Sequence, residues 1–135
     1  MTYFGLKTAI VGALAVTGVF ATQAIQPAEA GWDICKDVRI KVVNKTNNPI
    51  KLVDLDYIDM RIDRKRSENI SNRVIKKGKS YTWERNLEKV KNAKIKIRAQ
   101  YQTLKSNGKW KLIPKNKLSA SKKCTGSTKF TINIT

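Results

Sequence analysis

The stretch that decides the fold is DVRIKVVNKTNNPIKLVDLDYIDMRI, residues 37–62. Apolar and charged side chains alternate through residues 38–42, and a period of two is typical of a strand with one buried and one solvent-exposed face. The alternation resumes at residues 50–52, after a polar turn at residues 47–49. We therefore predict two adjoining strands joined by this turn, onto which the strands further along the chain close.

The second of these strands changes face along its length. Its apolar positions lie on one face at residues 50–52, on the other at residues 53–57, and on the first face again at residues 58–62. A period of two cannot change face without an irregularity in the strand. We therefore predict a bulge or a short crossover near residues 54–59.

The rest of the chain has the pattern of further short strands separated by polar turns. The clearest strand is residues 95–101, where Ile, Ala and Tyr alternate with Lys, Arg and Gln. Residues 106–108, Ser-Asn-Gly, predict a hairpin with a type I′ turn. Residues 84–90 fit either a continued strand or one helical turn. Further predictions are a loop or exposed strand end at residues 63–67, strands at residues 69–75, at Tyr81 and Trp83, at Trp110 and Leu112 and at residues 130–134, and a loop at residues 114–126.

Together these segments indicate an all-β fold. About seven short strands separated by polar turns predict an antiparallel β-sandwich, immunoglobulin-like in general build. A small β-barrel is the alternative. Most of the Trp and Tyr side chains, Trp110 among them, lie on the inward phase of their strands, so we expect them to pack in the core.

Residues 1–30 have the features of a cleaved signal peptide. Lys7 precedes an apolar run at residues 8–21, and Ala28-Glu29-Ala30 supplies the small-x-small pattern that signal peptidases cut. The run is shorter than the about 20 residues that a membrane-spanning helix needs, and an uncleaved N-terminal anchor is the alternative. We predict a single domain over residues 31–135, with no integral membrane span, in an exported, periplasmic or extracellular protein.

Export would permit a disulfide, and the sequence has two cysteines, Cys35 and Cys124. Only one intramolecular pairing is available to them. We predict that they form a disulfide that closes nearly the whole domain. The alternative is two free thiols, which suits an exported protein poorly.

The charge of the chain is extreme, with 28 Lys and Arg against 10 Asp and Glu and a formal net charge of +18. Such an excess predicts affinity for a polyanion: anionic polysaccharide, lipopolysaccharide, acidic lipid or nucleic acid. There is no histidine. Catalytic triads that contain His are therefore excluded, and so are zinc sites that use His, the commonest zinc ligand.

The acidic residues cluster at one place. We interpret this cluster as partners of the neighbouring basic side chains, with a metal site or a glycosidase-type carboxylate pair as less favoured alternatives. We therefore expect no enzymatic activity, no cofactor and no metal. The cluster consists of Asp54, Asp56, Asp59 and Asp63.

Basic side chains alternate with apolar ones on three predicted strands, and so face away from the core. If these strands share a sheet, they form one continuous cationic face. The alternative is that the cations serve solubility and edge protection. The predicted anion-binding residues are Arg39, Lys41, Lys94, Lys96, Arg98, Lys109 and Lys111, and a second basic cluster consists of Arg61, Arg64, Lys65 and Arg66.

Two segments resemble the aegerolysin-type small β-sandwiches that bind lipids. They are Val43-Asn44-Lys45-Thr46 with Ile50-Lys51-Leu52, and Gly78-Lys79-Ser80-Tyr81-x-Trp83. The chain departs from that family in its signal peptide, its cysteine pair and its very basic charge, so the resemblance transfers no residue and no activity.

These features predict an exported, non-enzymatic binding protein whose cationic sheet face contacts an anionic envelope component or polymer. The alternative is a periplasmic protein–protein module, such as an inhibitor or immunity protein for an acidic partner. That alternative predicts one tight, stoichiometric complex with partial salt sensitivity.

Overall fold

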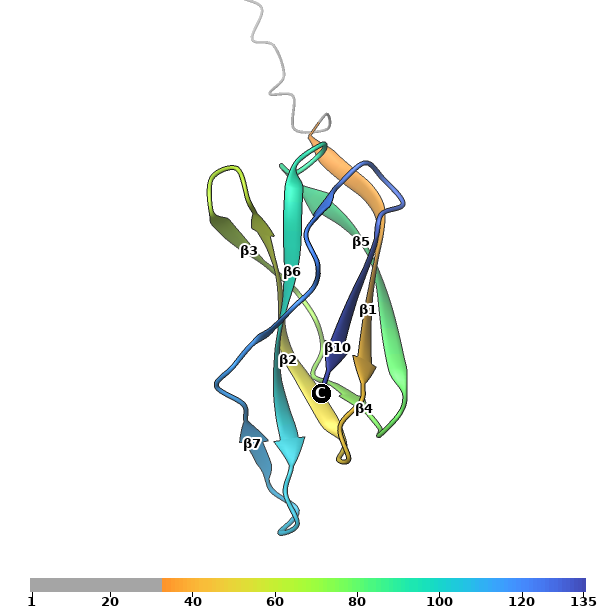
Figure 1. The fold of residues 1–135 in the computed structure, drawn as a ribbon, viewed down its shortest axis with the longest axis vertical. Helices are drawn as coiled ribbons and strands as arrows, with labels where there is room; N and C mark the ends of the chain where they lie inside the picture. The colour runs from red at the N-terminus through yellow and green to blue at the C-terminus, as the bar shows by residue number, and fades with distance from the viewer. Residues whose placement is uncertain (1–32) are drawn as a thin grey trace, which may run out of the picture.

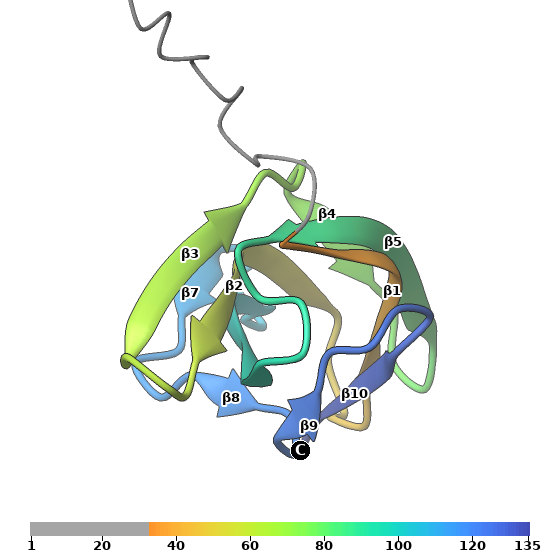
Figure 2. The same cartoon turned by 90° about the horizontal axis from the view of Figure 1, so that it is seen from above.

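The computed structural model describes residues 33–135, so the predicted signal peptide lies outside the described residues. In this part of the chain, two β-sheets face each other across one core (Figures 1 and 2), and no helix is long and apolar enough to cross a membrane. The strands are β1 (Ile34–Asn44), β2 (Ile50–Asp59), β3 (Arg64–Glu68), β4 (Arg73–Ile75), β5 (Ser80–Glu88), β6 (Lys94–Leu104), β7 (Trp110–Leu112), β8 (Lys117–Leu118), β9 (Lys122–Lys123) and β10 (Lys129–Ile134).

The first sheet, sheet A, has the strand order β10-β1-β5, with β1 antiparallel to β5 and parallel to β10. The second, sheet B, has the order β3-β2-β6-β7; β4 also pairs with β2, and β8 and β9 also pair with β6. The predicted all-β, sandwich-like fold is thus confirmed, but the sandwich is not purely antiparallel as predicted, because β1 and β10 are parallel. The described residues contain ten strands rather than about seven. β8 and β9 have two residues each, too few for a period of two to reveal, and β3 lies where the sequence predicts a loop or an exposed strand end.

The two strands of residues 37–62 do not pair with each other, so this part of the prediction is wrong. β1 belongs to sheet A and β2 to sheet B, and the turn between them crosses from one sheet to the other (Figure 1). Both strands bury their apolar face in the same core, Val42 from one side and Ile50 from the other. Alternation identifies the buried face of a strand but not its hydrogen-bonded neighbours, which here come from distant parts of the chain.

β2 contains an irregularity close to the place where the sequence predicts one. Its pairing with β6 shifts register between Leu52 and Asp54, so Val53 is the extra residue of a bulge. The second change of face, predicted at residues 58–62, does not occur. The strand instead ends at Asp59 and a turn follows.

Two local predictions on either side of β6 are settled by the structure. Of the two alternatives for residues 84–90, the continued strand is confirmed, because β5 extends to Glu88, and there is no helical turn. The β6–β7 hairpin is present, but its turn is not type I′: Gly108 has a φ of 75° and Asn107 is not among the residues with positive φ. The Gly108 N–H donates to the Lys105 carbonyl at 3.0 Å, as in a type I turn followed by a left-handed glycine.

The predicted disulfide joins Cys35 and Cys124, whose Cα atoms are 5.8 Å apart and whose side chains are buried. It links the start of β1 to the segment that precedes β10. Since β1 and β10 are paired in sheet A, the disulfide fixes together the first and last strands of the sandwich.

Asn44, at the end of β1, organises the turn that crosses between the sheets. Its side chain is fully buried, and its Nδ2 donates to the carbonyls of Asn48 and Ile75 at 2.8 and 2.9 Å. Its Oδ1 accepts from the backbone N–H and the hydroxyl of Thr46 at 2.9 and 2.8 Å. The amide therefore ties the β1–β2 turn to the end of β4.

We predict that Asn44→Ala lowers the free energy of unfolding by about 3 kcal/mol, because the Ile75 carbonyl loses its only side-chain donor and the Thr46 N–H loses its side-chain acceptor. Urea denaturation measures the change. The matched control is Asn47→Ala in the same turn, where the side chain is exposed, and a change within about 0.5 kcal/mol is expected. A loss below about 1 kcal/mol for Asn44→Ala would show that other contacts hold the turn.

Candidate anion-binding site

The seven residues of the predicted cationic face do not share one sheet, so the prediction of a continuous face is wrong. Arg39 and Lys41 lie on the outer face of sheet A, in β1. Lys94, Lys96 and Arg98 lie on the outer face of sheet B, in β6. In a sandwich both sheets have an outer face, and alternation in the sequence does not distinguish the two.

The phase of β7 is the reverse of that expected. Trp110 and Leu112 pair with Leu104 and Gln102, which are on the outward phase of β6. The two apolar side chains therefore lie on the outer face of sheet B, and Lys111 points to the opposite side of the strand.

Trp110 is consequently not a core residue, contrary to the expectation for its strand phase. It is half-buried, and the ammonium nitrogen of Lys51 lies 4.6 Å from the centroid of its ring. This is a cation–π contact at the surface. Lys109, the remaining predicted residue of this hairpin, is exposed in the β6–β7 turn.

Arg98 is held within the protein by carboxylates. Its Nε lies 2.6 Å from Oδ2 of Asp56, its Nη2 contacts the same oxygen, and Asp54 is 3.9 Å away. The Asp56 side chain is 1% exposed and also accepts a hydrogen bond from Ser67 at 2.6 Å. A buried carboxylate requires such partners, so Arg98 serves the fold rather than an external anion.

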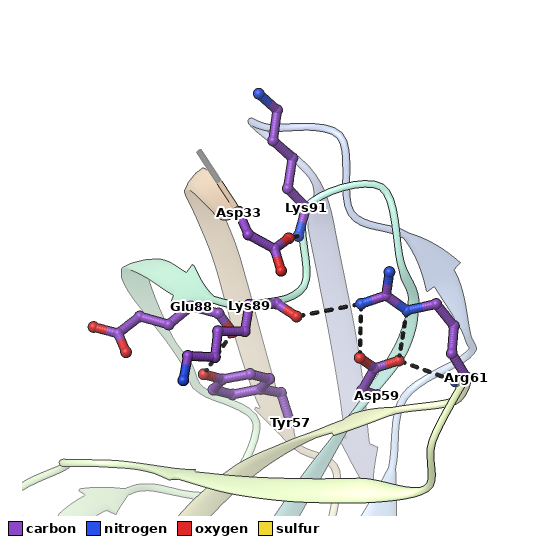
Figure 3. A network of polar contacts seen from close by, with 7 residues as sticks. All are labelled: Asp33, Tyr57, Asp59, Arg61, Glu88, Lys89 and Lys91. Atoms are coloured by element: carbon purple, nitrogen blue, oxygen red, sulfur yellow. Dashed lines mark hydrogen bonds and ion pairs between the residues drawn. The ribbon is translucent and has the colours of Figure 1, made fainter. Parts of the chain in front are cut away.

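Asp59 and Arg61 form the second internal ion pair (Figure 3). The Arg61 guanidinium donates to both carboxylate oxygens of Asp59, at 3.1 and 2.8 Å, and the Arg61 backbone N–H donates to the same group at 3.0 Å. The guanidinium also donates to the Lys89 carbonyl at 3.3 Å, which links the β2–β3 turn to the β5–β6 turn. The prediction that the acidic cluster pairs with neighbouring basic residues is thus confirmed for Asp59, whereas Asp54 and Asp56 pair with Arg98 of β6 instead.

This ion pair predicts a pH dependence of stability. The hydrogen bonds from Arg61 hold the pKa of Asp59 below its ordinary value, although burial opposes the shift. Because the pKa is lower in the folded state, the stabilisation is complete above the unfolded value of about 4 and is lost as the pH falls further. We expect Asp59→Asn to be less stable than wild type above pH ~4 in urea titrations, with a difference that shrinks at lower pH.

The control for that prediction is Asp63→Asn in the same turn, where the side chain is exposed and makes no ion pair with another described residue. We expect it to leave the acid limb of the stability curve unchanged. An equal shrinkage for both variants would assign the pH dependence to the general charge of the domain.

The other three residues of the second basic cluster do not form one exposed cationic surface. Arg64 and Lys65 are exposed in β3. Arg66 is half-buried, because it is paired with the core residue Tyr57, and its Nη1 is buried without a hydrogen-bond partner among the described residues.

Lysines on the outer face of sheet B lie opposite one another. Lys94 of β6 is directly paired with Lys123 of β9, and Lys96 follows two residues further along the same face. None of the three forms an ion pair among the residues that the structure describes. Like charges directly opposite each other destabilise a sheet, so these cations gain from an external anion.

A second group of exposed cations lies at the end of the sandwich where the β1–β2, β4–β5 and β6–β7 turns meet (lower end in Figure 1). All six lysines there are exposed, and residues 45–49, 76–79 and 105–109 contain no Asp or Glu. We call this surface the lysine end. It consists of Lys45, Lys76, Lys77, Lys79, Lys105 and Lys109.

Backbone hydrogen bonds hold the three turns together. The Gly78 N–H donates to the Asn44 carbonyl at 2.9 Å, and the Asn44 N–H donates to the Lys79 carbonyl at 2.9 Å. On the other side, the Leu104 N–H donates to the Pro49 carbonyl at 3.2 Å. The six ammonium groups therefore project from one rigid base, and of the seven predicted binding residues only Lys109 belongs to it.

A groove of about 460 Å³ opens at the lysine end, between the β1–β2 turn and the β6–β7 hairpin. Three polar residues, two apolar residues and one of the lysines line it. The lining residues are Asn48, Pro49, Thr103, Leu104, Lys105 and Ser106. The groove offers hydrogen-bond partners beside the charges.

A second groove of about 460 Å³ lies beside β5, between residues 81–85 and a wall that includes Asn69 and Arg73. β5 pairs with β1 on one edge only, so its other edge has no partner strand among the described residues. The Arg73 guanidinium stacks 4.0 Å from the centroid of Tyr81. The unpaired edge of β5 therefore lines this groove.

Among the residues that the structure describes, no group of three or more His, Cys, Asp or Glu side chains is placed to hold a metal ion. The comparison with known proteins finds no matching family model, no matching curated protein and no matching solved structure. Function is therefore inferred from the residues and their geometry.

Proposed function

We propose that this protein is an exported, non-enzymatic binding protein, and that its lysine end holds an anionic polymer. The observation that carries the proposal is the meeting of three turns with six exposed lysines and no carboxylate side chain. Concentrated positive charge of this kind attracts polyanions and is not neutralised within the fold.

An anionic polysaccharide fits the lysine end better than the other polyanions that the composition suggests. Single-stranded nucleic acid is bound on aromatic stacking platforms, and the three turns contain no Trp, Tyr or Phe. Trp110, which follows the third turn, is half-buried and already contacts Lys51 through its ring. The neighbouring groove instead carries amide and hydroxyl groups from Asn48, Thr103 and Ser106. Such groups hydrogen-bond to sugar hydroxyls while the lysines contact the charged substituents.

Heparin, a sulfated polysaccharide, is a suitable probe for this proposal. Titration calorimetry of the oxidised protein from about 50 to about 500 mM NaCl should give a binding constant whose logarithm falls linearly with the logarithm of salt. The slope should correspond to several neutralised charges. Absence of binding at the lowest salt, or binding that salt does not weaken, would overturn the proposal.

The disulfide supports the proposed export. Disulfides persist in oxidising compartments such as the periplasm and the extracellular medium and are rare in the cytosol. The Cys35–Cys124 bond is also the only cysteine pair that the described residues contain.

A second candidate function, a protein–protein module, is supported by the free edge of β5. An extended segment of an acidic partner would add a strand to β5 and place a carboxylate on Arg73. In a pulldown from envelope extract, this candidate predicts one protein that stays bound at high salt and is lost with Thr82→Pro and Arg73→Gln. Release of every bound component at moderate salt would exclude it.

A further inference from the structure

At the end opposite the lysine end, the β2–β3 turn presents two large apolar side chains to solvent. Met60 is 42% exposed and Ile62 is 61% exposed, the highest value among the large hydrophobic residues described. They stand two positions apart on a four-residue turn, residues 60–63. From this turn and its surroundings we propose that this end of the protein docks on a membrane that contains anionic lipid.

Cations flank the two apolar side chains. Arg64 and Lys65 follow the turn directly and are exposed. Lys94 adjoins it, because the Met60 N–H donates to the Lys94 carbonyl at 2.9 Å, and Lys123 is paired with Lys94. These four cations outnumber the one exposed carboxylate of the turn, Asp63. Apolar side chains beside an excess of cations match the two layers of an anionic membrane surface, acyl chains beneath charged headgroups.

The turn is held in shape before it meets a membrane. Arg61, which lies between the two apolar residues, is turned back onto the buried Asp59 carboxylate and the Lys89 carbonyl (Figure 3). Its side chain thus serves as an anchor within the protein, while Met60 and Ile62 remain outside it. A preformed turn loses little conformational entropy when it binds.

This proposal is independent of the one for the lysine end, because the two surfaces lie at opposite ends of the sandwich (Figure 1). A free polyanion has no apolar layer, so Met60 and Ile62 contribute nothing to its binding. Both the cations and the two apolar side chains contribute to membrane binding, and this difference is the basis of the test.

The test is co-sedimentation of the oxidised protein with vesicles of phosphatidylcholine, with and without about one third phosphatidylglycerol. We expect binding to the anionic vesicles only, and the double variant Met60→Ser/Ile62→Ser should bind them about tenfold or more weakly, since it loses apolar burial. The same variant should bind heparin as wild type does. Lys65→Gln/Lys94→Gln should also weaken vesicle binding, by about 30-fold at about 1 kcal/mol for each cation.

Val74→Ser/Leu112→Ser is the matched control. These side chains are 48% and 46% exposed on the outer face of sheet B, away from the β2–β3 turn, and the change in apolar surface is comparable. Unchanged vesicle binding is expected. The proposal is overturned if wild type does not bind anionic vesicles, or if the Met60 and Ile62 variant binds them as tightly as wild type.

Discussion

Reduction of the Cys35–Cys124 disulfide should lower the free energy of unfolding by about 4 kcal/mol, the largest stability change expected for a single bond in this domain. The two residues are 89 positions apart, so the bond removes much of the freedom of the unfolded chain. It also joins β1 to the segment before β10, and the parallel pairing of those strands connects the two ends of the domain.

Urea denaturation of the oxidised protein, the reduced protein and the Cys35→Ala/Cys124→Ala variant measures this effect. The reduced protein and the variant should agree within about 1 kcal/mol, because both lack the same constraint. A domain of this size has about 5–15 kcal/mol of stability in total. A difference below about 1 kcal/mol between the oxidised and reduced proteins would show that the native contacts alone hold β1 and β10 together.

The second large effect is expected at the lysine end. Replacement of four lysines by glutamine should weaken heparin binding by about 1000-fold at low salt, at about 1 kcal/mol for each cation near an anionic surface. The slope of the salt dependence should fall as well, since fewer counterions are displaced. The substitutions are Lys76→Gln, Lys77→Gln, Lys79→Gln and Lys105→Gln.

A matched variant removes the same charge from the two sheet faces. If the lysine end is the binding surface, this variant should lose about tenfold or less, through the overall field alone. Equal losses in the two variants would mean that net charge, rather than the meeting of the three turns, determines binding. The control substitutions are Lys41→Gln, Lys94→Gln, Lys96→Gln and Lys123→Gln.

Much of the fold could be predicted from the sequence, because the positions of a strand that face the core are apolar and can be recognised from the alternation of residue types. The alternation in residues 95–101 places one side of β6 in the core, and the residues that it marks as inward are buried. No comparable pattern in the sequence shows which strands are hydrogen-bonded to each other. Alternation in β1 and β2 is the same whether they form a hairpin or, as here, lie in opposite sheets.

The lysine end could not be predicted from strand patterns, because its residues belong to turns. Lys45, Lys76 and Lys105 lie in three turns that are far apart along the chain, and only the topology brings these turns to one end. One signal was present in the sequence: each of these turns contains lysine and no acidic residue. By contrast, Arg98 fits the alternating pattern, but its guanidinium forms an ion pair with the Asp56 carboxylate and so serves the fold.

Amine-reactive footprinting of the lysines, with and without heparin, tests the central claim most directly. Mass spectrometry reports the reactivity of each lysine in the oxidised protein. If the lysine end holds the polymer, heparin should protect Lys76, Lys77 and Lys105 strongly and leave Lys41 reactive. Uniform protection of all lysines, or protection confined to the sheet faces, would contradict this assignment.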